Sequence, residues 1–289
     1  MATNIELIKI LRERTGAGIM DCKNALAATG DDVDKASDWL REKGIAKQAK
    51  KADRIAAEGL VTIAQNGLKA VLVEVNCETD FVANSDPFKE LVAQIADKVL
   101  NGNFASFEEA NAAVAPLFTD ATVKLGEKLT FRRFELVQAA EGHSLTGYIH
   151  GKGKIGVLVD IEKADEELGK GIAMTVAAYS PKYASFADIP ADVIEAEKKV
   201  QLEACKNDEK LKNKPEQALV KIVEGKVNKY FSESVLEQIG YIYEPEKTVG
   251  QVLKEKGNAV VRFVRFQTGE GIEKRVDNFA EEVAKQAGN

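Results

Sequence analysis

Residues 59–83 read GLVTIAQNGLKAVLVEVNCETDFVA, and this stretch decides the fold. The pair Asn66-Gly67 is a strong signal for a tight β-turn, because both residues tolerate positive φ. It separates a first β segment, 59–62, from the apolar run 71–75, which suits a buried strand. The sequence therefore predicts a β-hairpin, followed by a helix with apolar residues at helical spacing: Leu91, Val92, Ile95, Ala96 and Val99.

The same plan returns later in the chain. A strand at 147–150, a glycine turn and a strand at 155–161 precede a second apolar helix. Segments 129–137 and 259–267 also have strand character and are expected to enlarge the two sheets. Two hairpin-plus-helix units predict a core of two related subdomains, in which the strands pair antiparallel.

Three short helices are predicted before the first sheet. Ile5, Ile8 and Leu11 share one helical face, and glycines at 16 and 18 end that helix. A second helix ends near Gly30, and a third follows. Such a bundle is close to the lower size limit for independent stability, so we expect it to dock onto another surface.

A basic stretch follows the bundle. Residues 43–54 carry a net charge of +4, which is typical of a linker or a solvated helix. RNA contact is the alternative, although the stretch has no aromatic side chain that could stack on bases.

Two helical segments are predicted near the end of the chain. Residues 192–232 have a helical pattern, with Val193, Val200 and Tyr230 among the repeating apolar positions, and the polar segment 207–215 interrupts it. This pattern predicts an antiparallel helical hairpin with a solvated tip. Beyond a short helix capped by Thr248, a final amphipathic helix is expected around Phe279.

Composition excludes several classes of protein. The 289 residues are 45% hydrophobic and 30% charged, with a net charge of −6, so a main role in gripping nucleic acid would need a strong local basic face. The N-terminal sequence has neither a secretory apolar core nor a membrane-spanning run, and we expect the protein in the cytoplasm. Three widely separated cysteines favour reduced thiols over disulfides or zinc.

No motif for catalysis or cofactor binding is complete. Residues 151–156, GKGKIG, match GxGxxG, but a strand follows them where a dinucleotide site requires a helix. The sequence contains no P-loop. His143 and His150 lack an HExxH spacing, and neither belongs to a recognisable catalytic triad motif. We therefore expect no catalytic residue, no cofactor, no metal site and no direct nucleotide binding.

The segment 76–82, NCETDFV, places a carboxylate beside a large aromatic group where the buried strand ends. The residue pattern alone favours a structural role, in which Phe81 fills the core, Asp80 caps a turn and Cys77 is a small buried hydrophobe. A functional role for the segment is the alternative.

Five segments resemble the elongation factor Ts family, in the family's order and spacing. They are LRERTGAGIMDCKNAL at 11–26, NCETDFVA at 76–83, IGVLV at 155–159, KTVGQVL at 247–253 and GEGIEK at 269–274. Together they extend the resemblance over essentially the whole chain.

The resemblance implies three groups of site residues. The segment that dislocates Mg²⁺ from the partner GTPase, elongation factor Tu, is matched by Thr79, Asp80, Phe81 and Val82. Contacts of the first bundle with a helix of the GTPase domain are matched by Arg12, Ile19, Met20 and Lys23. Contacts with the partner's third domain are matched in position by His150, Ile242 and Tyr243.

Pattern and resemblance together predict an α+β fold with a UBA-like three-helix bundle at the N terminus. We expect this docking domain and its basic linker at 1–54 and a first core subdomain at 55–140. The second core subdomain is expected at 141–187 and 231–265, interrupted by the helical hairpin at 188–230. A C-terminal module is expected at 266–289.

The implied function is guanine nucleotide exchange on elongation factor Tu, with no covalent chemistry. The protein would bind the GDP form, disturb the Mg²⁺ and phosphate region, and be displaced when GTP binds. No DNA or membrane partner is expected, and the hairpin is a candidate for self-association. The alternatives are an RNA-binding accessory protein that uses residues 43–54 and a thiol enzyme that uses Cys77.

Overall fold

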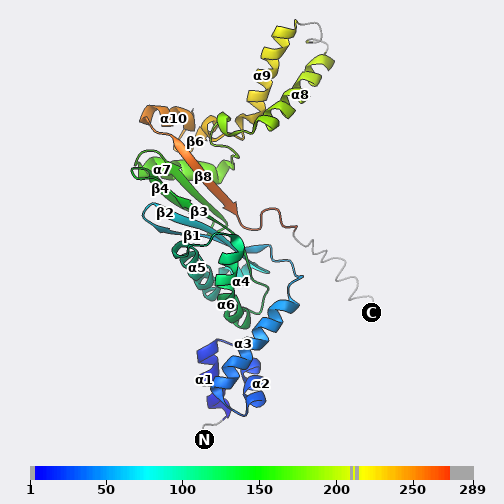
Figure 1. Ribbon diagram of the computed structural model, residues 1–289, viewed down its shortest axis with the longest axis vertical. Coiled ribbons are helices and arrows are strands. Elements are labelled where there is room, and N and C mark those ends of the chain that lie inside the picture. Colours follow the sequence, from blue (N-terminus) through cyan, green and yellow to red (C-terminus); the bar gives the residue numbers. More distant parts are fainter. Residues whose placement is uncertain (1–3, 209–210, 212–214, 274–289) are drawn as a thin grey trace.

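A computed structural model describes residues 4–208, 211 and 215–273, and it has an α+β architecture. The N-terminal bundle and a pair of long helices lie at opposite ends of the long axis, with the sheets between them (Figure 1). The predicted succession of three helices followed by antiparallel sheets with helices is confirmed.

The bundle consists of α1 (Asn4–Thr15), α2 (Ile19–Thr29) and α3 (Val33–Lys50). Gly16 and Gly30 have φ of 68° and 64°, so each lets the chain leave a helix in the left-handed conformation. The buried core of the bundle comprises Leu11, Ala17, Cys22, Ala25, Leu26, Ala36 and Leu40. Three helices of this size can bury only a small core, which fits a module that packs against a neighbour.

Helix α3 carries the chain from the bundle to the sheets. It continues to Lys50, so most of the stretch predicted as a linker or solvated helix is helical. It packs against α6 (Phe107–Leu125), whose Val123 joins the core of the bundle. A Cβ on Gly44 would lie 2.7 Å from Val123 Cγ2, so glycine permits this close approach. The bundle is therefore packed on α6 through α3.

The first sheet contains β1 (Glu58–Asn66), β2 (Lys69–Cys77) and β3 (Thr130–Gln138), paired antiparallel in the order β1-β2-β3. The predicted hairpin is present, but its turn lies one position later than Asn66-Gly67: Asn66 ends β1 in register with Lys69, and Gly67, with φ of 59°, and Leu68 form the turn. Helices α5 (Asp86–Asn101) and α6 cover one face, and a short helix α4 (Asp80–Asn84) follows β2. Helix α6 was not predicted from the residue pattern.

The second sheet repeats this arrangement with β4 (Ser144–His150), β5 (Ile155–Ile161) and β8 (Val260–Gln267) in the order β4-β5-β8. Helices α7 (Glu166–Tyr179) and α10 (Val249–Lys256) pack on its outer face, beside the small ribbon of β6 (Gly240–Tyr241) and β7 (Glu244–Thr248). The predicted capping box of Thr248 and Gln251 is present at the start of α10.

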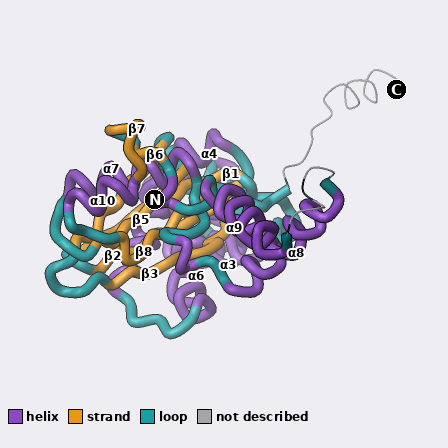
Figure 2. The backbone as a smooth tube through the Cα atoms, turned by 90° about the horizontal axis from the view of Figure 1, so that it is seen from above, coloured by secondary structure: helices purple, strands orange, loops and turns teal. Residues whose placement is uncertain are grey.

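The two sheets lie face to face and overlap when viewed along the long axis (Figure 2). Side chains alternate along β5, so Val157 and Val159 face α7 while Leu158 packs against the first sheet. Gly156 lies at this contact, where a Cβ would approach Val61 Cγ1 to 2.5 Å. Gly153, with φ of 91°, accepts a 2.7 Å hydrogen bond from Val61 N. These glycines of the GxGxxG match therefore serve sheet packing.

A buried carboxylate fixes the chain after β8. Glu74 has no exposed surface, and its oxygens accept hydrogen bonds from Arg132 Nη1 at 2.9 Å and Arg133 Nε at 2.6 Å. The same carboxylate accepts from the backbone N–H of Gly269 at 2.8 Å. These bonds compensate for removing the charge from water and hold the turn of the GEGIEK segment against the first sheet.

Helices α8 (Ala191–Asn207) and α9 (Glu216–Ser232) lie side by side and share a small core with Cys205, Val227 and Phe231. Val200 and Tyr230 are 61% and 59% exposed, so the sequence pattern assigned these two to the wrong side of their helices. The expected helix around Phe279 and most of the hairpin tip lie outside the described residues.

Candidate partner-binding site

The segment Thr79–Val82 forms the start of helix α4, directly after β2. Thr79 is the N-cap, and its Oγ1 accepts a 3.3 Å hydrogen bond from Val82 N. Asp80 therefore stands in the first turn and is not the cap that the sequence predicted. Val82 and the buried Ala83 face the core of the first subdomain. The helix is thus anchored along one side only.

Phe81 projects from the other side of α4 and is 85% exposed. The structural interpretation, in which Phe81 fills the core, is wrong. An isolated exposed apolar residue is common on protein surfaces, but an 85% exposed phenyl ring on an anchored helix leaves most of its apolar surface available to a partner. The described segment therefore presents an aromatic ring beside the carboxylate of Asp80.

Two glutamates hold the base of this segment through reciprocal contacts with backbone N–H groups. Glu127 follows α6, and its Oε2 accepts from Glu78 N at 2.9 Å and Thr79 N at 3.1 Å. Its Oε1 accepts from Thr79 Oγ1 at 2.6 Å. In the opposite direction, Glu78 Oε1 accepts from Lys128 N at 2.6 Å. Sequence reasoning missed Glu127, because it lies 48 residues from Thr79 and belongs to no local motif.

Cys77 lies beneath the segment and is fully buried. Its Sγ donates to the carbonyl oxygen of Thr79 at 3.2 Å. Burial, together with the negative charge of Glu127, raises the pKa of the Cys77 thiol to about 12. A thiol that stays protonated and has no access to solvent is a poor nucleophile, so this geometry does not support the thiol-enzyme alternative.

Of the four residues expected on the N-terminal bundle, Arg12 on α1 and Ile19 on α2 line one groove, and Met20 and Lys23 lie on α2. Ile19 and Met20 are 55% and 63% exposed, and Arg12 and Lys23 are exposed as well. A groove of about 580 Å³ is lined by Ile5, Ile8, Lys9, Arg12, Glu13 and Ile19. Its lining combines three isoleucines with three charged side chains, which suits an amphipathic helix that is laid into it. Ile5 is a further exposed member of this surface, although its periodicity suggested a core position.

The remaining expected residues, His150, Ile242 and Tyr243, lie on two separate elements. His150 is exposed at the end of β4, and its Nδ1 lies 3.0 Å from Tyr148 Oη. Ile242 and Tyr243 lie in the turn between β6 and β7, where Ile242 N donates to Thr175 Oγ1 on α7 at 3.1 Å. Tyr243 is 48% exposed.

The β4–β5 turn and the Thr79–Val82 segment lie at the same end of the paired sheets. Lys154, in that turn, forms a 2.7 Å ion pair with Glu58 at the start of β1. Glu58 is in register with Cys77 at the end of β2. The structure therefore brings His150 to the same end of the paired sheets as Phe81.

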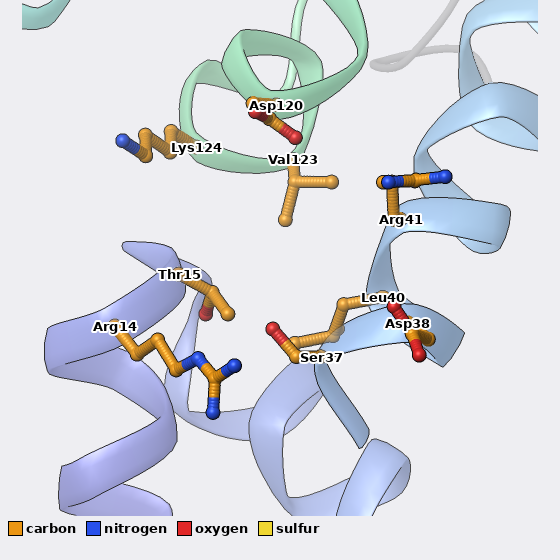
Figure 3. Close-up of a pocket in the computed structure, with 9 residues that line it drawn as sticks. All are labelled: Arg14, Thr15, Ser37, Asp38, Leu40, Arg41, Asp120, Val123 and Lys124. Carbon is orange, nitrogen blue, oxygen red and sulfur yellow. The ribbon is translucent and has the colours of Figure 1, made fainter. Parts of the chain in front are cut away.

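A separate cavity of about 250 Å³ lies between the bundle and α6 (Figure 3). It is lined by Arg14, Thr15, Ser37, Asp38, Leu40, Arg41, Asp120, Val123 and Lys124. Basic and acidic side chains are mixed, and the Arg14 guanidinium lies 2.6 Å from the Asp34 carboxylate. None of the expected site residues lines this cavity.

Within the part of the chain that the structure describes, no three His, Cys, Asp or Glu side chains are grouped as metal ligands. No helix among those same residues is long and apolar enough to cross a membrane. His143 forms a 2.9 Å contact with Asp160 at the edge of the second sheet, away from the exposed segment.

A comparison with protein-family models matches residues 78–270 to the model described as Elongation factor TS. The match starts at Glu78, immediately before the exposed segment, and ends at Glu270 in the turn that Glu74 holds. It covers 193 of the 289 residues, and both sheets contribute to it. The chain therefore belongs to the elongation factor Ts family.

Proposed function

We propose that this protein is a guanine nucleotide exchange factor that acts on elongation factor Tu during translation elongation in the cytoplasm. Family membership implies the exchange role. The observation that best supports a site for it is the 85% exposure of Phe81 on a helix that is otherwise firmly anchored. The free protein keeps this ring in water, so a partner surface gains the hydrophobic free energy of burying it.

In this proposal the Thr79–Val82 segment enters the GTPase domain near the bound nucleotide. Phe81 acts as an apolar wedge, and Asp80 places a negative charge near the Mg²⁺ and phosphate region. Thr79 and Val82 fix the helix that carries them. Because the metal ion neutralises the phosphate charges, displacing it removes a large part of the nucleotide's binding free energy.

Two other surfaces supply docking contacts in this proposal. The groove beside Arg12 and Ile19, with Met20 and Lys23 on the same helix as Ile19, receives a helix of the GTPase domain. The second subdomain offers His150, Ile242 and Tyr243 to the third domain of the partner. Residues 1–54 act as the docking domain, and the two sheets with their helices act as the frame that separates the surfaces.

The energetics require no catalytic group in this chain. A nucleotide held with nanomolar affinity is bound by about 12 kcal/mol, so it leaves slowly by itself. A protein that binds the empty GTPase more tightly weakens nucleotide binding by the same factor, because the coupling is reciprocal. GTP then enters and expels the exchange factor. This protein is not expected to bind GDP or GTP directly.

The RNA-binding alternative has less support than the exchange function, because basic side chains of residues 43–54 form contacts within the protein. Arg54 forms a 3.2 Å ion pair with Glu78, and Lys51 Nζ donates to the carbonyl oxygen of Gly126. These cations are thus partly engaged within the protein. Self-association through the hairpin is a second proposal, supported by the exposed apolar side chains of Val200, Val220 and Tyr230.

Size-exclusion chromatography with purified elongation factor Tu tests the proposal. We expect a stable complex when a chelator removes Mg²⁺ and the nucleotide dissociates. We expect millimolar GDP with Mg²⁺ to dissociate this complex. A complex that is equally stable with and without GDP would contradict the reciprocal coupling on which nucleotide exchange depends.

A further inference from the structure

The loop Gly126–Lys128 lies between two parts of the chain that are far apart in sequence. On one side it holds the base of helix α4, and on the other it holds residues 51–54, which connect the bundle to β1. Gly126 ends α6 with φ of 71°, and this conformation turns the chain so that Glu127 and Lys128 follow directly.

Toward α4, the loop satisfies backbone groups that would otherwise lack partners within the protein. Both oxygens of Glu127 are used, one by the N–H groups of Glu78 and Thr79 and the other by Thr79 Oγ1. A hydrogen bond to a charged acceptor is stronger than one between neutral groups, and three of them converge here on one carboxylate.

Toward the bundle, the loop contacts the connecting segment 51–54 through two lysine side chains, one from the loop and one from the segment. Lys128 Nζ donates to the carbonyl oxygens of Ala52 and, at 2.7 Å, Arg54. Lys51 Nζ donates to the carbonyl oxygen of Gly126. Arg54 also pairs with Glu78, whose carboxylate bonds to Lys128 N. The connector, the loop and the base of α4 are therefore joined in one polar network.

We propose that Glu127 is a positioning residue that fixes Phe81 relative to the N-terminal docking surface. The inference rests on the proposed exchange function and adds to it a residue that touches neither nucleotide nor partner. Helix α4 has only five residues and cannot keep its own geometry in water. Its direction depends on Val82, Ala83 and the bonds to Glu127. Docking of the bundle can deliver Phe81 to one place only while that base is fixed.

The substitution Glu127→Gln tests this role with little change of shape. An amide oxygen is a neutral acceptor, so the bonds from the two N–H groups weaken, and the N–H₂ group that takes the place of the second oxygen cannot accept the proton of the Thr79 hydroxyl. We expect the rate of GDP release at saturating factor to fall roughly ten- to hundredfold. The factor concentration that gives half of that rate, which reports docking, should change less than about threefold. Amide hydrogen exchange at residues 79–84 of the free protein should accelerate.

Glu109→Gln is the matched control. Glu109 lies in the first turn of α6, at the opposite end of that helix from Glu127, and its Oε2 accepts a 2.9 Å hydrogen bond from Ala105 N. This control should leave the rate of GDP release unchanged, and it should also leave amide hydrogen exchange at residues 79–84 unchanged. In a Phe81→Ala background, Glu127→Gln should slow release less than twofold further, because the side chain being positioned is gone. The inference is overturned if the two substitutions slow GDP release independently, so that their fold-losses multiply in the double variant. It is also overturned if Glu127→Gln alone leaves the rate of GDP release unchanged. If the wild-type protein did not accelerate GDP release from elongation factor Tu, the proposed function would fail first, and this inference with it.

Discussion

Replacing Phe81 with alanine distinguishes a wedge from a structural residue. Complete burial of a Phe side chain contributes ~1.5–3 kcal/mol, and Phe81 is 85% exposed, so its buried fraction contributes less than about 0.5 kcal/mol. Alanine also has the higher helix propensity, which offsets part of that loss. We therefore expect the melting temperature of Phe81→Ala to stay within about 2 °C of the wild type.

The effect on nucleotide exchange should be much larger. A Phe side chain offers roughly 150–250 Å² for burial in a partner, and alanine retains only its first carbon. Once the area that alanine still buries is subtracted, a ring at the lower end of that range loses roughly 80–120 Å², which at ~25 cal/mol per Å² is about 2–3 kcal/mol of favourable interaction. If this interaction forms as the nucleotide leaves, release slows roughly 30- to 150-fold. Stopped-flow release of fluorescent GDP from elongation factor Tu, in excess Mg²⁺, measures this rate.

Phe88→Ala is the matched control, because Phe88 is the same residue type with no exposed surface in α5. It should cost about 3–5 kcal/mol of stability, while the molecules that remain folded exchange normally. The wedge account is refuted if Phe81→Ala behaves as Phe88→Ala is expected to behave, with a large fall in melting temperature and normal release per folded molecule.

Three further predictions concern docking, the buried thiol and a helix cap. Met20→Ser should raise the factor concentration for half-maximal GDP release about tenfold without changing the plateau or the melting temperature; a lowered plateau would contradict a docking role. Iodoacetamide at pH 8 should alkylate Cys77 over ~10³-fold more slowly than a free thiol and leave exchange intact, because its pKa is about 12; rapid labelling of native protein would contradict this. Asp165 caps α7 by accepting from Leu168 N, and this bond lowers the carboxyl pKa, so Asp165→Ala should cost about 1 kcal/mol at neutral pH. That cost should shrink as pH falls from about 4 through the lowered pKa in urea unfolding curves, and a pH-independent difference would exclude the charged cap.

Strong local signals made much of the fold predictable. The hairpin indicated by Asn66-Gly67, the two-strand repeats and the Thr248 capping box each depend on residues within a few positions of one another, and all three occur, although the turn of the hairpin falls on Gly67 and Leu68. Helix α6 was not predicted, because its alanines and Pro116 weaken its amphipathic pattern. A solvated helix was one of the two interpretations of residues 43–54, but the packing of the end of α3 against α6 was not predicted, because it is a tertiary effect that the basic composition does not encode.

The site was less predictable for the same reason. Residue chemistry alone favoured a buried Phe81, since a large aromatic side chain after a buried strand is usually part of the core. Only the family resemblance indicated a functional segment, and the exposure of Phe81 agrees with that interpretation. Glu127 could not be found from sequence, because its contacts with Glu78 and Thr79 exist only after α6 has packed against the sheet.

The most direct test of the exchange proposal is release of labelled GDP from elongation factor Tu with this protein at one-tenth of the GTPase concentration. Excess unlabelled GTP and Mg²⁺ are present throughout. Because the factor is expelled after each exchange, we expect all of the label to leave at a rate proportional to the concentration of this protein. Release no faster than the spontaneous rate, or release that stops after one GDP per molecule of this protein, would contradict the proposal.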